Sequence, residues 1–186
     1  VHAQCEESKL FSLNGQPIDA FGWSVDVVGD VMVVGSLGED DANPADSDCN
    51  SGAAHVYERS GGTWTEVARL VASDQACGDQ FGQDVEIAGN RILVTAHQHG
   101  AGAVYVFNNG VGWVEEQKLV GSDSQLTFHF GHSASMAGDT VLVGVMRDTH
   151  AGNDSGSAFI FERAAGTWTE TAKLIASNPQ AGARFG

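Results

Sequence analysis

Residues 21–36 carry the sequence FGWSVDVVGDVMVVGS, in which a Phe-Gly pair opens two apolar stretches separated by a Gly-Asp pair. The same arrangement returns as FGQDVEIAGNRILVTA at residues 81–96 and as FGHSASMAGDTVLVGV at residues 130–145. A Gly-Asp or Gly-Asn pair between apolar stretches is typical of a two-residue hairpin turn, because glycine adopts positive φ without steric cost. Each copy therefore predicts a hairpin of two short strands.

A second repeated arrangement of residue types follows each hairpin after a polar loop. It is SGAAHVYERSGGTWTEVARL at residues 51–70, AGAVYVFNNGVGWVEEQKL at residues 101–119 and SGSAFIFERAAGTWTETAKL at residues 155–174. Each stretch predicts a third strand, a Gly-containing turn and a fourth strand. The fourth strand mixes polar and apolar residues, as an outer strand does when one of its faces meets water. Helical spacing is absent, so no helix is predicted.

Four antiparallel strands in a repeat of roughly 50–60 residues describe one blade of a β-propeller. We therefore predict an all-β fold, a β-propeller of four-stranded antiparallel blades. The single partial propeller, residues 1–186, divides into a closing outer strand at 1–20, blades at 21–80, 81–129 and 130–184, and the start of a next blade at 185–186. Three blades do not close a ring, so remaining blades are expected from the same chain or from neighbouring subunits. A β-sandwich is the alternative, but its strands do not normally repeat in sequence.

The charge of the chain restricts its partners. The net charge is −15, from 24 acidic and 9 basic residues. Because nucleic acid and anionic membrane surfaces would both be repelled, neither is an expected partner. No apolar run approaches the ~20 residues needed to span a bilayer, so membrane insertion is not expected either.

The quoted motifs resemble the FG-GAP repeats of the integrin α-subunit propeller, and more closely those of bacterial secreted and surface proteins. The resemblance covers residues 8–186. It implies a seven-bladed propeller in the intact protein, an extracellular or cell-surface location, and a role in adhesion or ligand binding. Several integrin blades carry an Asp-rich calcium loop between the first and second strands. Here that position holds only Gly29-Asp30, Gly89-Asn90 and Gly138-Asp139, which are too short to supply six to eight oxygen ligands, so those calcium sites are not expected.

An acid-rich segment, residues 38–52, joins the second and third strands of the first blade. Its hard oxygen ligands are Asp40, Asp41, Asn43, Asp46 and Asp48. They make calcium the one cofactor that the sequence suggests, although the spacing does not fit the helix-loop-helix calcium signature. The alternative is a solvated loop in which Asp, Asn and Pro form turns. The matching loop of the third blade, residues 147–156, contains Asp148, Asn153 and Asp154.

The three cysteines are Cys5, Cys49 and Cys77. In a propeller, the loops between second and third strands share one face with the linkers between blades, and we call this face the loop face. Cys49 lies in such a loop and Cys77 in such a linker, on either side of one blade. A Cys49–Cys77 disulfide is therefore predicted, which would place the protein in an oxidising compartment. The alternative is two separate thiols, and Cys5 is left over in both cases.

Four histidines, His97, His99, His129 and His150, are expected on the loop face. His97 and His99 would point the same way if their segment were extended. A zinc or copper site needs three or four convergent ligands. The alternative is a set of histidines that form local hydrogen bonds.

Trp64, Trp113 and Trp168 occupy equivalent positions in the fourth strands. Because the position is repeated, structural packing is the favoured role. A platform for stacking sugars is the alternative.

The sequence contains no nucleophile elbow, phosphate loop or zinc-protease motif. We therefore expect a non-enzymatic extracellular module that presents its loop face to a protein or glycan ligand. One alternative is an accessory or catalytic propeller of a polysaccharide-degrading enzyme, which would bring carboxylates and aromatic residues together at the central axis. Another is a structural subunit of a larger assembly.

Overall fold

The structure is a computed structural model that describes residues 9–12, 16, 18–40, 49–126 and 128–186. These residues form twelve strands and no helix, so no helix in them crosses a membrane. The strands are β1 (Phe21–Val28), β2 (Val31–Ser36), β3 (Ala53–Ser60), β4 (Thr63–Leu70), β5 (Val85–Ala88), β6 (Arg91–Ala96), β7 (Ala103–Asn108), β8 (Val114–Leu119), β9 (Phe130–Ala137), β10 (Thr140–Val145), β11 (Ser157–Ala164) and β12 (Thr167–Leu174).

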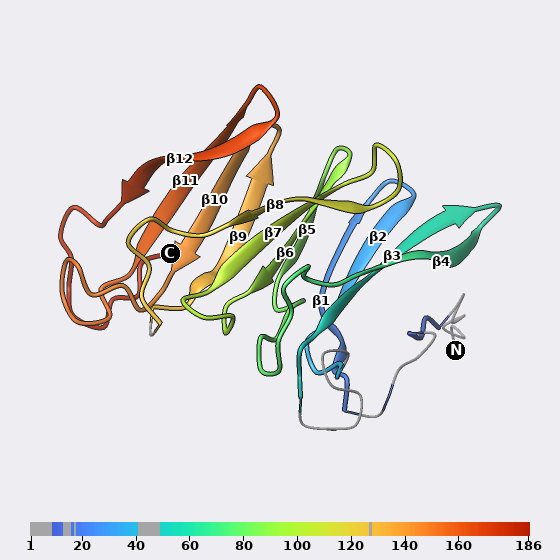
Figure 1. Ribbon diagram of the computed structural model, residues 1–186, viewed down its shortest axis with the longest axis horizontal. Helices are drawn as coiled ribbons and strands as arrows, with labels where there is room; N and C mark the ends of the chain where they lie inside the picture. Colours follow the sequence, from blue (N-terminus) through green and yellow to red (C-terminus); the bar gives the residue numbers. More distant parts are fainter. Residues whose placement is uncertain (1–8, 13–15, 17, 41–48, 127) are drawn as a thin grey trace, which may run out of the picture.

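The strands form three four-stranded antiparallel sheets, and within each sheet the strands lie in chain order. Figure 1 shows the sheets standing side by side in the order of the sequence. The first strands of successive sheets contact one another, β1 with β5 and β5 with β9. This is the arrangement of propeller blades about an axis, and it confirms the predicted fold. The predicted hairpin turns are also present, with Gly29, Gly89 and Gly138 at φ of 63°, 62° and 60°.

Two apolar cores lie between the blades. The first joins Val33 and Leu70 of the first blade to Phe81 of the second, and the second joins Leu93 of the second blade to Phe130 of the third. Both phenylalanines are fully buried, so the Phe of these two Phe-Gly pairs fills a contact between blades. Full burial of a large apolar side chain stabilises the fold by about 1.5–3 kcal/mol.

The glycines of the repeat allow close approach of one backbone to another. Gly82 has a φ of +93°, and a Cβ there would lie 2.4 Å from the carbonyl oxygen of Ala53. Gly52 has a φ of +83°, and a Cβ there would lie 2.1 Å from the carbonyl oxygen of Phe81. A side chain at either position would force the two blades apart.

Carboxylates on the first strands also join the blades. Asp26 Oδ2 accepts a hydrogen bond from the backbone N–H of Ile87 at 2.7 Å, and Glu86 Oε2 accepts one from the N–H of Met136 at 2.7 Å. Asp26 and Glu86 are equivalent positions of the repeat. N–H groups on the edge strand of a sheet have no partner within that sheet, and these two carboxylates of the preceding blade accept their hydrogen bonds.

The outer face of the third blade is apolar and exposed. Val33 and Leu93 are 0% and 1% exposed, whereas their equivalent in the third blade, Leu142, is 42% exposed. Likewise Leu119 is 1% exposed and its equivalent Leu174 is 39% exposed. This face has the composition of a contact between blades but has no blade against it.

The predicted closing strand is only partly described. Residues 9–12 are not part of a strand, and the rest of residues 1–17 lies outside the described residues except for residue 16. The backbone oxygen of Phe11 accepts a hydrogen bond from the Tyr57 hydroxyl at 2.9 Å, so this segment does contact the first blade. Its role as a closing strand stays a prediction.

Candidate functional site

The loop face has a repeated framework in which each loop is paired with the linker to the next blade. Gly52 forms a parallel bridge with Phe81, and Gly156 forms the same bridge with Phe185. The N–H of Phe81 donates to the carbonyl oxygen of Ser51 at 3.0 Å, next to the first bridge. The end of each loop is therefore held by the backbone of the following linker.

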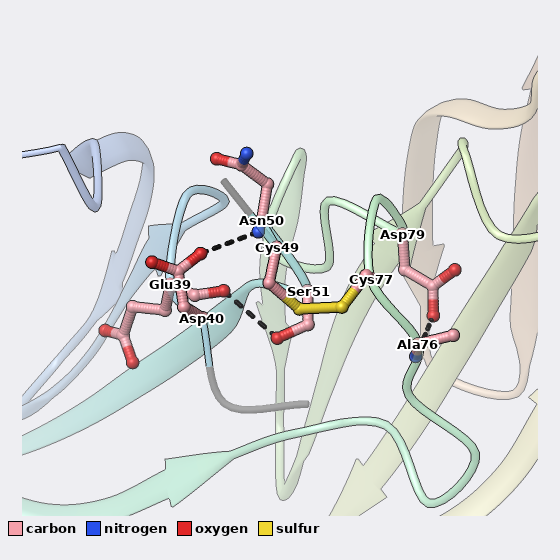
Figure 2. The surroundings of a disulfide bond; sticks show 8 residues. All are labelled: Glu39, Asp40, Cys49, Asn50, Ser51, Ala76, Cys77 and Asp79. Atoms are coloured by element: carbon pink, nitrogen blue, oxygen red, sulfur yellow. Dashed lines mark hydrogen bonds between the residues drawn. A yellow bond between two sulfur atoms is a disulfide. The ribbon is translucent and has the colours of Figure 1, made fainter. Parts of the chain in front are cut away.

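A disulfide strengthens this pairing in the first blade. Cys49 and Cys77 are bonded, with a sequence separation of 28 and Cα atoms 4.4 Å apart (Figure 2). Cys49 is 1% exposed, whereas Cys77 is exposed, so the bond joins a buried position of the loop to the surface of the linker. The predicted disulfide is confirmed, and it links the acid-rich loop to the linker that leads into the second blade.

The two ends of the acid-rich loop also contact each other. Asp40 Oδ1 accepts a hydrogen bond from the backbone N–H of Asn50 at 2.7 Å, and the Ser51 hydroxyl donates to the carbonyl oxygen of Glu39 at 3.0 Å (Figure 2). Residues 41–48 lie outside the described residues. Four of the proposed calcium ligands, Asp41, Asn43, Asp46 and Asp48, belong to that segment, so the calcium site stays a prediction.

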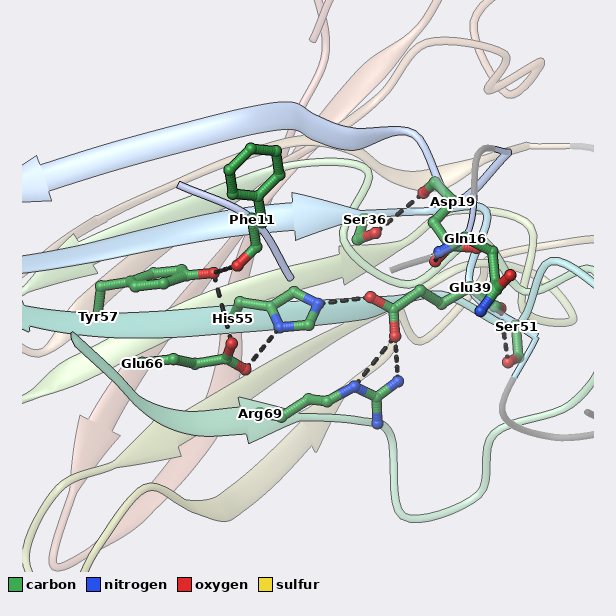
Figure 3. A network of polar contacts seen from close by, with 10 residues as sticks. All are labelled: Phe11, Gln16, Asp19, Ser36, Glu39, Ser51, His55, Tyr57, Glu66 and Arg69. Atoms are coloured by element: carbon green, nitrogen blue, oxygen red, sulfur yellow. Dashed lines mark hydrogen bonds and ion pairs between the residues drawn. The ribbon is translucent and has the colours of Figure 1, made fainter. Parts of the chain in front are cut away.

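A buried polar network lies under the acid-rich loop (Figure 3). His55, on β3, is fully buried, with Nε2 2.5 Å from Glu39 Oε1 and Nδ1 2.9 Å from Glu66 Oε1. Arg69, on β4, donates to Glu39 Oε2. A ring with a carboxylate at each nitrogen donates from both, which requires the charged imidazolium.

The pKa shifts within this network favour the charged forms of both His55 and Glu39. Burial alone lowers the pKa of His55, but hydrogen bonds to Glu39 and Glu66 outweigh burial and raise that pKa above its ordinary value. Burial alone raises the pKa of Glu39, but His55 and Arg69 outweigh it and lower that pKa. Because the His55 ring is closed off from solvent, it anchors the loop and offers no face to a substrate.

Sequence reasoning missed this network. Glu39 could not be distinguished from the other acids of the loop in the sequence. The available signal was His55, a polar ring in the middle of an otherwise apolar stretch, AAHVY.

The same position carries a different polar group in each blade. The third residue after the second strand is Glu39, His99 or Asp148, and the base on the fourth strand is Arg69, Lys118 or Lys173. Lys118 Nζ is 2.7 Å from His99 Nε2, and Lys173 Nζ is 2.7 Å from Asp148 Oδ2. Each loop is thus joined to the outer strand of its own blade by one ionisable pair.

A candidate metal-binding group occurs in the third of these clusters. Asp123, Asp148 and His150 each place a ligand atom within 4.8 Å of the others. Lys173 Nζ, however, lies 2.7 Å from both carboxylates and 3.2 Å from His150 Nδ1. The ammonium already occupies the place of a cation, so we assign this cluster an internal ion pair.

The remaining groups of this loop have the same structural role. Burial raises the pKa of Asp148, but Lys173, Ser157 and His150 outweigh burial and hold that pKa far below its ordinary value. Asn153 and Asp154, the other two residues named for this loop, accept hydrogen bonds from the following linker through their backbone oxygens, at 2.8 and 3.1 Å.

The four histidines expected on the loop face separate into different groups. His99 contacts Lys118 and Asp79, and His150 contacts Asp148. His97 and His129 lie together, 5.3 Å between ring centres. The expectation that His97 and His99 point the same way is wrong, because their segment turns: the N–H of His99 donates to the oxygen of Ala96 at 3.1 Å.

Two of the repeated tryptophans, Trp113 and Trp168, pack between blades, whereas Trp64 lies against Arg59 of its own blade. Trp168 is 3% exposed and belongs to the second apolar core, and its backbone N–H and oxygen bond to the Gln117 side chain of the second blade at 2.9 and 2.8 Å. Trp113 packs against the first core in the equivalent way. A buried ring offers no face to a sugar, so packing is the role of Trp168.

Comparison with known proteins agrees with this architecture. The model of the FG-GAP repeat matches residues 5–57, 64–107 and 113–161. The last two matches begin in or beside a fourth strand, β4 or β8, and end in the third strand of the next blade, so the family unit is offset by one strand from the blade. No curated protein matches the chain. Because the three matches cover most of the chain, it belongs to the FG-GAP repeat family.

Proposed function

We propose that this chain is a non-enzymatic propeller module of an extracellular or cell-surface protein, and that it binds a protein or glycan ligand through its loop face. The observation that carries the proposal is the Cys49–Cys77 disulfide. It fixes the most acidic loop of the chain to the blade framework on one face, and disulfides persist in oxidising compartments. Variable loops on a regular scaffold are a common basis for ligand binding.

The ionisable groups under these loops support a binding role over a catalytic one. His55 is held between Glu39 and Glu66, and Lys173 is held between Asp148 and Asp123. In both clusters the acids and bases are paired with each other. Such pairs position loops, whereas catalysis needs a group that reaches the substrate.

The observations give less support to a polysaccharide-degrading propeller. That function would need carboxylates and aromatic rings that converge on a substrate at the axis. The first-strand carboxylates of Asp26 and Glu86 instead accept hydrogen bonds from the next blade, and Trp168 is buried.

Further blades are the proposed occupants of the exposed face of the third blade. Leu142 and Leu174 lie there at positions that are buried elsewhere in the repeat. Those blades would come from the same chain or from neighbouring subunits. Size-exclusion chromatography separates these sources, because a stable monomer of the 186-residue chain argues against an obligate structural subunit.

Calcium bound at the acid-rich loop is part of the proposal. The proposed ligands are Asp40, which the structure describes, and Asp41, Asn43, Asp46 and Asp48, which lie outside the described residues. A bound calcium ion would let an acidic loop bind an acidic ligand. Calorimetric titration with calcium tests this point. Absence of both heat and a change in melting temperature would remove calcium from the proposal.

The ligand-binding proposal is tested with two charge-matched variants. One replaces Asp46 and Asp48 with Asn in the acid-rich loop, and the other replaces Asp30 and Asp139 with Asn in the hairpin turns, so each variant removes two negative charges. Both are compared with the unaltered chain for binding to immobilised glycans and extracellular-matrix proteins, with and without calcium. Loss of binding only in the acid-rich-loop variant supports the proposal. Equal binding by all three proteins, or cleavage of a glycan by the purified chain, would overturn it.

A further inference from the structure

Three histidine rings meet where the second and third blades touch. His97 follows β6 of the second blade, His129 directly precedes β9 of the third blade, and His132 lies within β9. The ring centres of His97 and His129 are 5.3 Å apart, and those of His97 and His132 are 5.8 Å apart. The chain itself thus gathers three imidazoles at one contact between blades.

The central ring of this group, His97, is buried and incompletely bonded. His97 is 8% exposed, and its Nδ1 has no hydrogen-bond partner in the part of the chain that the structure describes. A buried polar atom without a partner carries an unfavourable desolvation free energy. His129 and His132 are partly exposed, so the group is reached from solvent through these two rings.

The repeat shows that the fold does not require histidine at these positions. The equivalent contact between the first and second blades has Leu37, Gln80 and Gln83 in place of His97, His129 and His132. The backbone is the same at both contacts, since Gln80 and His129 have φ values of 55° and 58°. The three histidines are therefore an addition to one contact and not part of the framework.

The spacing of the rings suits a tetrahedral metal ion. With metal–nitrogen bonds of ~2.0 Å, the ring centres of two imidazoles on a tetrahedral ion lie about 5 Å apart. The two separations from His97, to His129 and to His132, are close to this value. Among the described residues, the group whose ligand atoms all lie within 4.8 Å of one another is Asp123, Asp148 and His150, not the three histidines. The histidine rings must therefore rotate about their side-chain torsions to aim their nitrogens at one metal ion.

The surroundings of His97 and His129 disfavour the charged form of these two rings. Burial, together with the neighbouring His129 and His132, lowers the pKa of His97 to about 4. Burial and the charge of Arg147 lower the pKa of His129. Arg147 also repels a metal cation, but the net charge of −15 on the whole chain favours cation binding.

We infer that His97, His129 and His132 form a tri-histidine site for a transition-metal ion such as Zn²⁺ or Cu²⁺, located at the contact of the second and third blades. Imidazole nitrogen suits these ions and does not suit calcium. Three protein ligands leave the fourth position of a tetrahedral ion open to water or to a carboxylate of a bound ligand. The site is separate from the Asp123–Asp148–His150 cluster, where Lys173 takes the place of the cation.

The test uses the chain without a histidine tag and a variant in which the second contact receives the residues of the first, His97→Leu, His129→Gln and His132→Gln. Zn²⁺ binding is measured by isothermal titration calorimetry, and Co²⁺ binding by visible absorption, whose intensity reports tetrahedral coordination. The control variant, His99→Gln with His150→Gln, removes two loop-face histidines outside the site.

The unaltered chain and the control are expected to bind one Zn²⁺ per chain with the same affinity, and the triple variant is expected to bind at least about tenfold more weakly. The single substitution His132→Gln, at a partly exposed ring, is expected to weaken binding by a similar factor and guards against misfolding of the triple variant. Binding that is unchanged in the triple variant, binding that is lost in the control, or absence of Zn²⁺ binding by the unaltered chain would each overturn the inference.

Discussion

Replacing Cys49 and Cys77 together with serine removes the covalent link between the acid-rich loop and the linker to the second blade. The bond closes a loop with a sequence separation of 28. In the chain-entropy description, a loop of this length restricts the unfolded chain enough to stabilise the fold by about 3–4 kcal/mol. For a domain of this size, each kcal/mol lowers the melting temperature by ~2–4 °C, so the double variant should melt roughly 10 °C lower.

Calorimetric melting with and without a thiol reductant measures this effect. The unaltered chain should fall to the melting temperature of the double variant when reductant is added, and the double variant should not respond to reductant. Cys5→Ser serves as the matched control, because it removes a cysteine that is not part of this bond. It should melt like the unaltered chain and keep the response to reductant.

A double variant that melts within about 2 °C of the unaltered chain would refute the reasoning. The backbone pairing of the loop with the linker, such as the hydrogen bond from Phe81 to Ser51, would then be enough to hold the loop. The disulfide would in that case contribute little to the loop face on which the proposed function depends.

Three further substitutions test separate parts of the structure. Gly82→Ala places a Cβ 2.4 Å from a carbonyl oxygen at positive φ and should lower the free energy of unfolding by about 2–4 kcal/mol in urea titrations. The control Gly62→Ala, which has positive φ but nothing within 4 Å of the added Cβ, should lower it by about 1–2 kcal/mol. Equal losses in the two variants would contradict the close approach of the blades. Because the pKa of His55 is raised, its stabilisation is complete below about pH 6.5 and is lost as the pH rises through the raised pKa. The urea stability of the unaltered chain relative to His55→Phe should therefore be greater at about pH 6 than at about pH 9, and a pH-independent difference would exclude a charged His55. Lys173→Met leaves the buried Asp148 without its ammonium partner and should lower the free energy of unfolding by about 3 kcal/mol in the same urea assay. Adding Asp148→Asn in a double variant should restore most of this free energy. Additive losses would show that the two residues do not act as a pair.

The candidate site was only partly predictable. The disulfide followed from topology, because a loop and a linker that flank one blade must lie on the same face. The anchor of the acid-rich loop did not, since Glu39 resembles its acidic neighbours in the sequence and only the fold places His55 beside it. Likewise His132 lies in a strand and gave no signal until the second and third blades were placed together.

The amino-acid sequence by itself determined the strands, the hairpin turns and the blade repeat, because these depend on neighbours in the chain: glycine at positive φ and apolar stretches of fixed length. It also determined that a Phe-Gly pair recurs in each copy, and the structure places Phe81 and Phe130 of these pairs between blades. Only the tertiary structure decided which loop side chains meet. His97 faces the third blade, whereas His99, two residues later, contacts Lys118 of its own blade and Asp79 of the preceding linker. The two sides of a blade pack against different neighbours, so the partners of a loop residue depend on the direction of a turn that residue spacing does not specify.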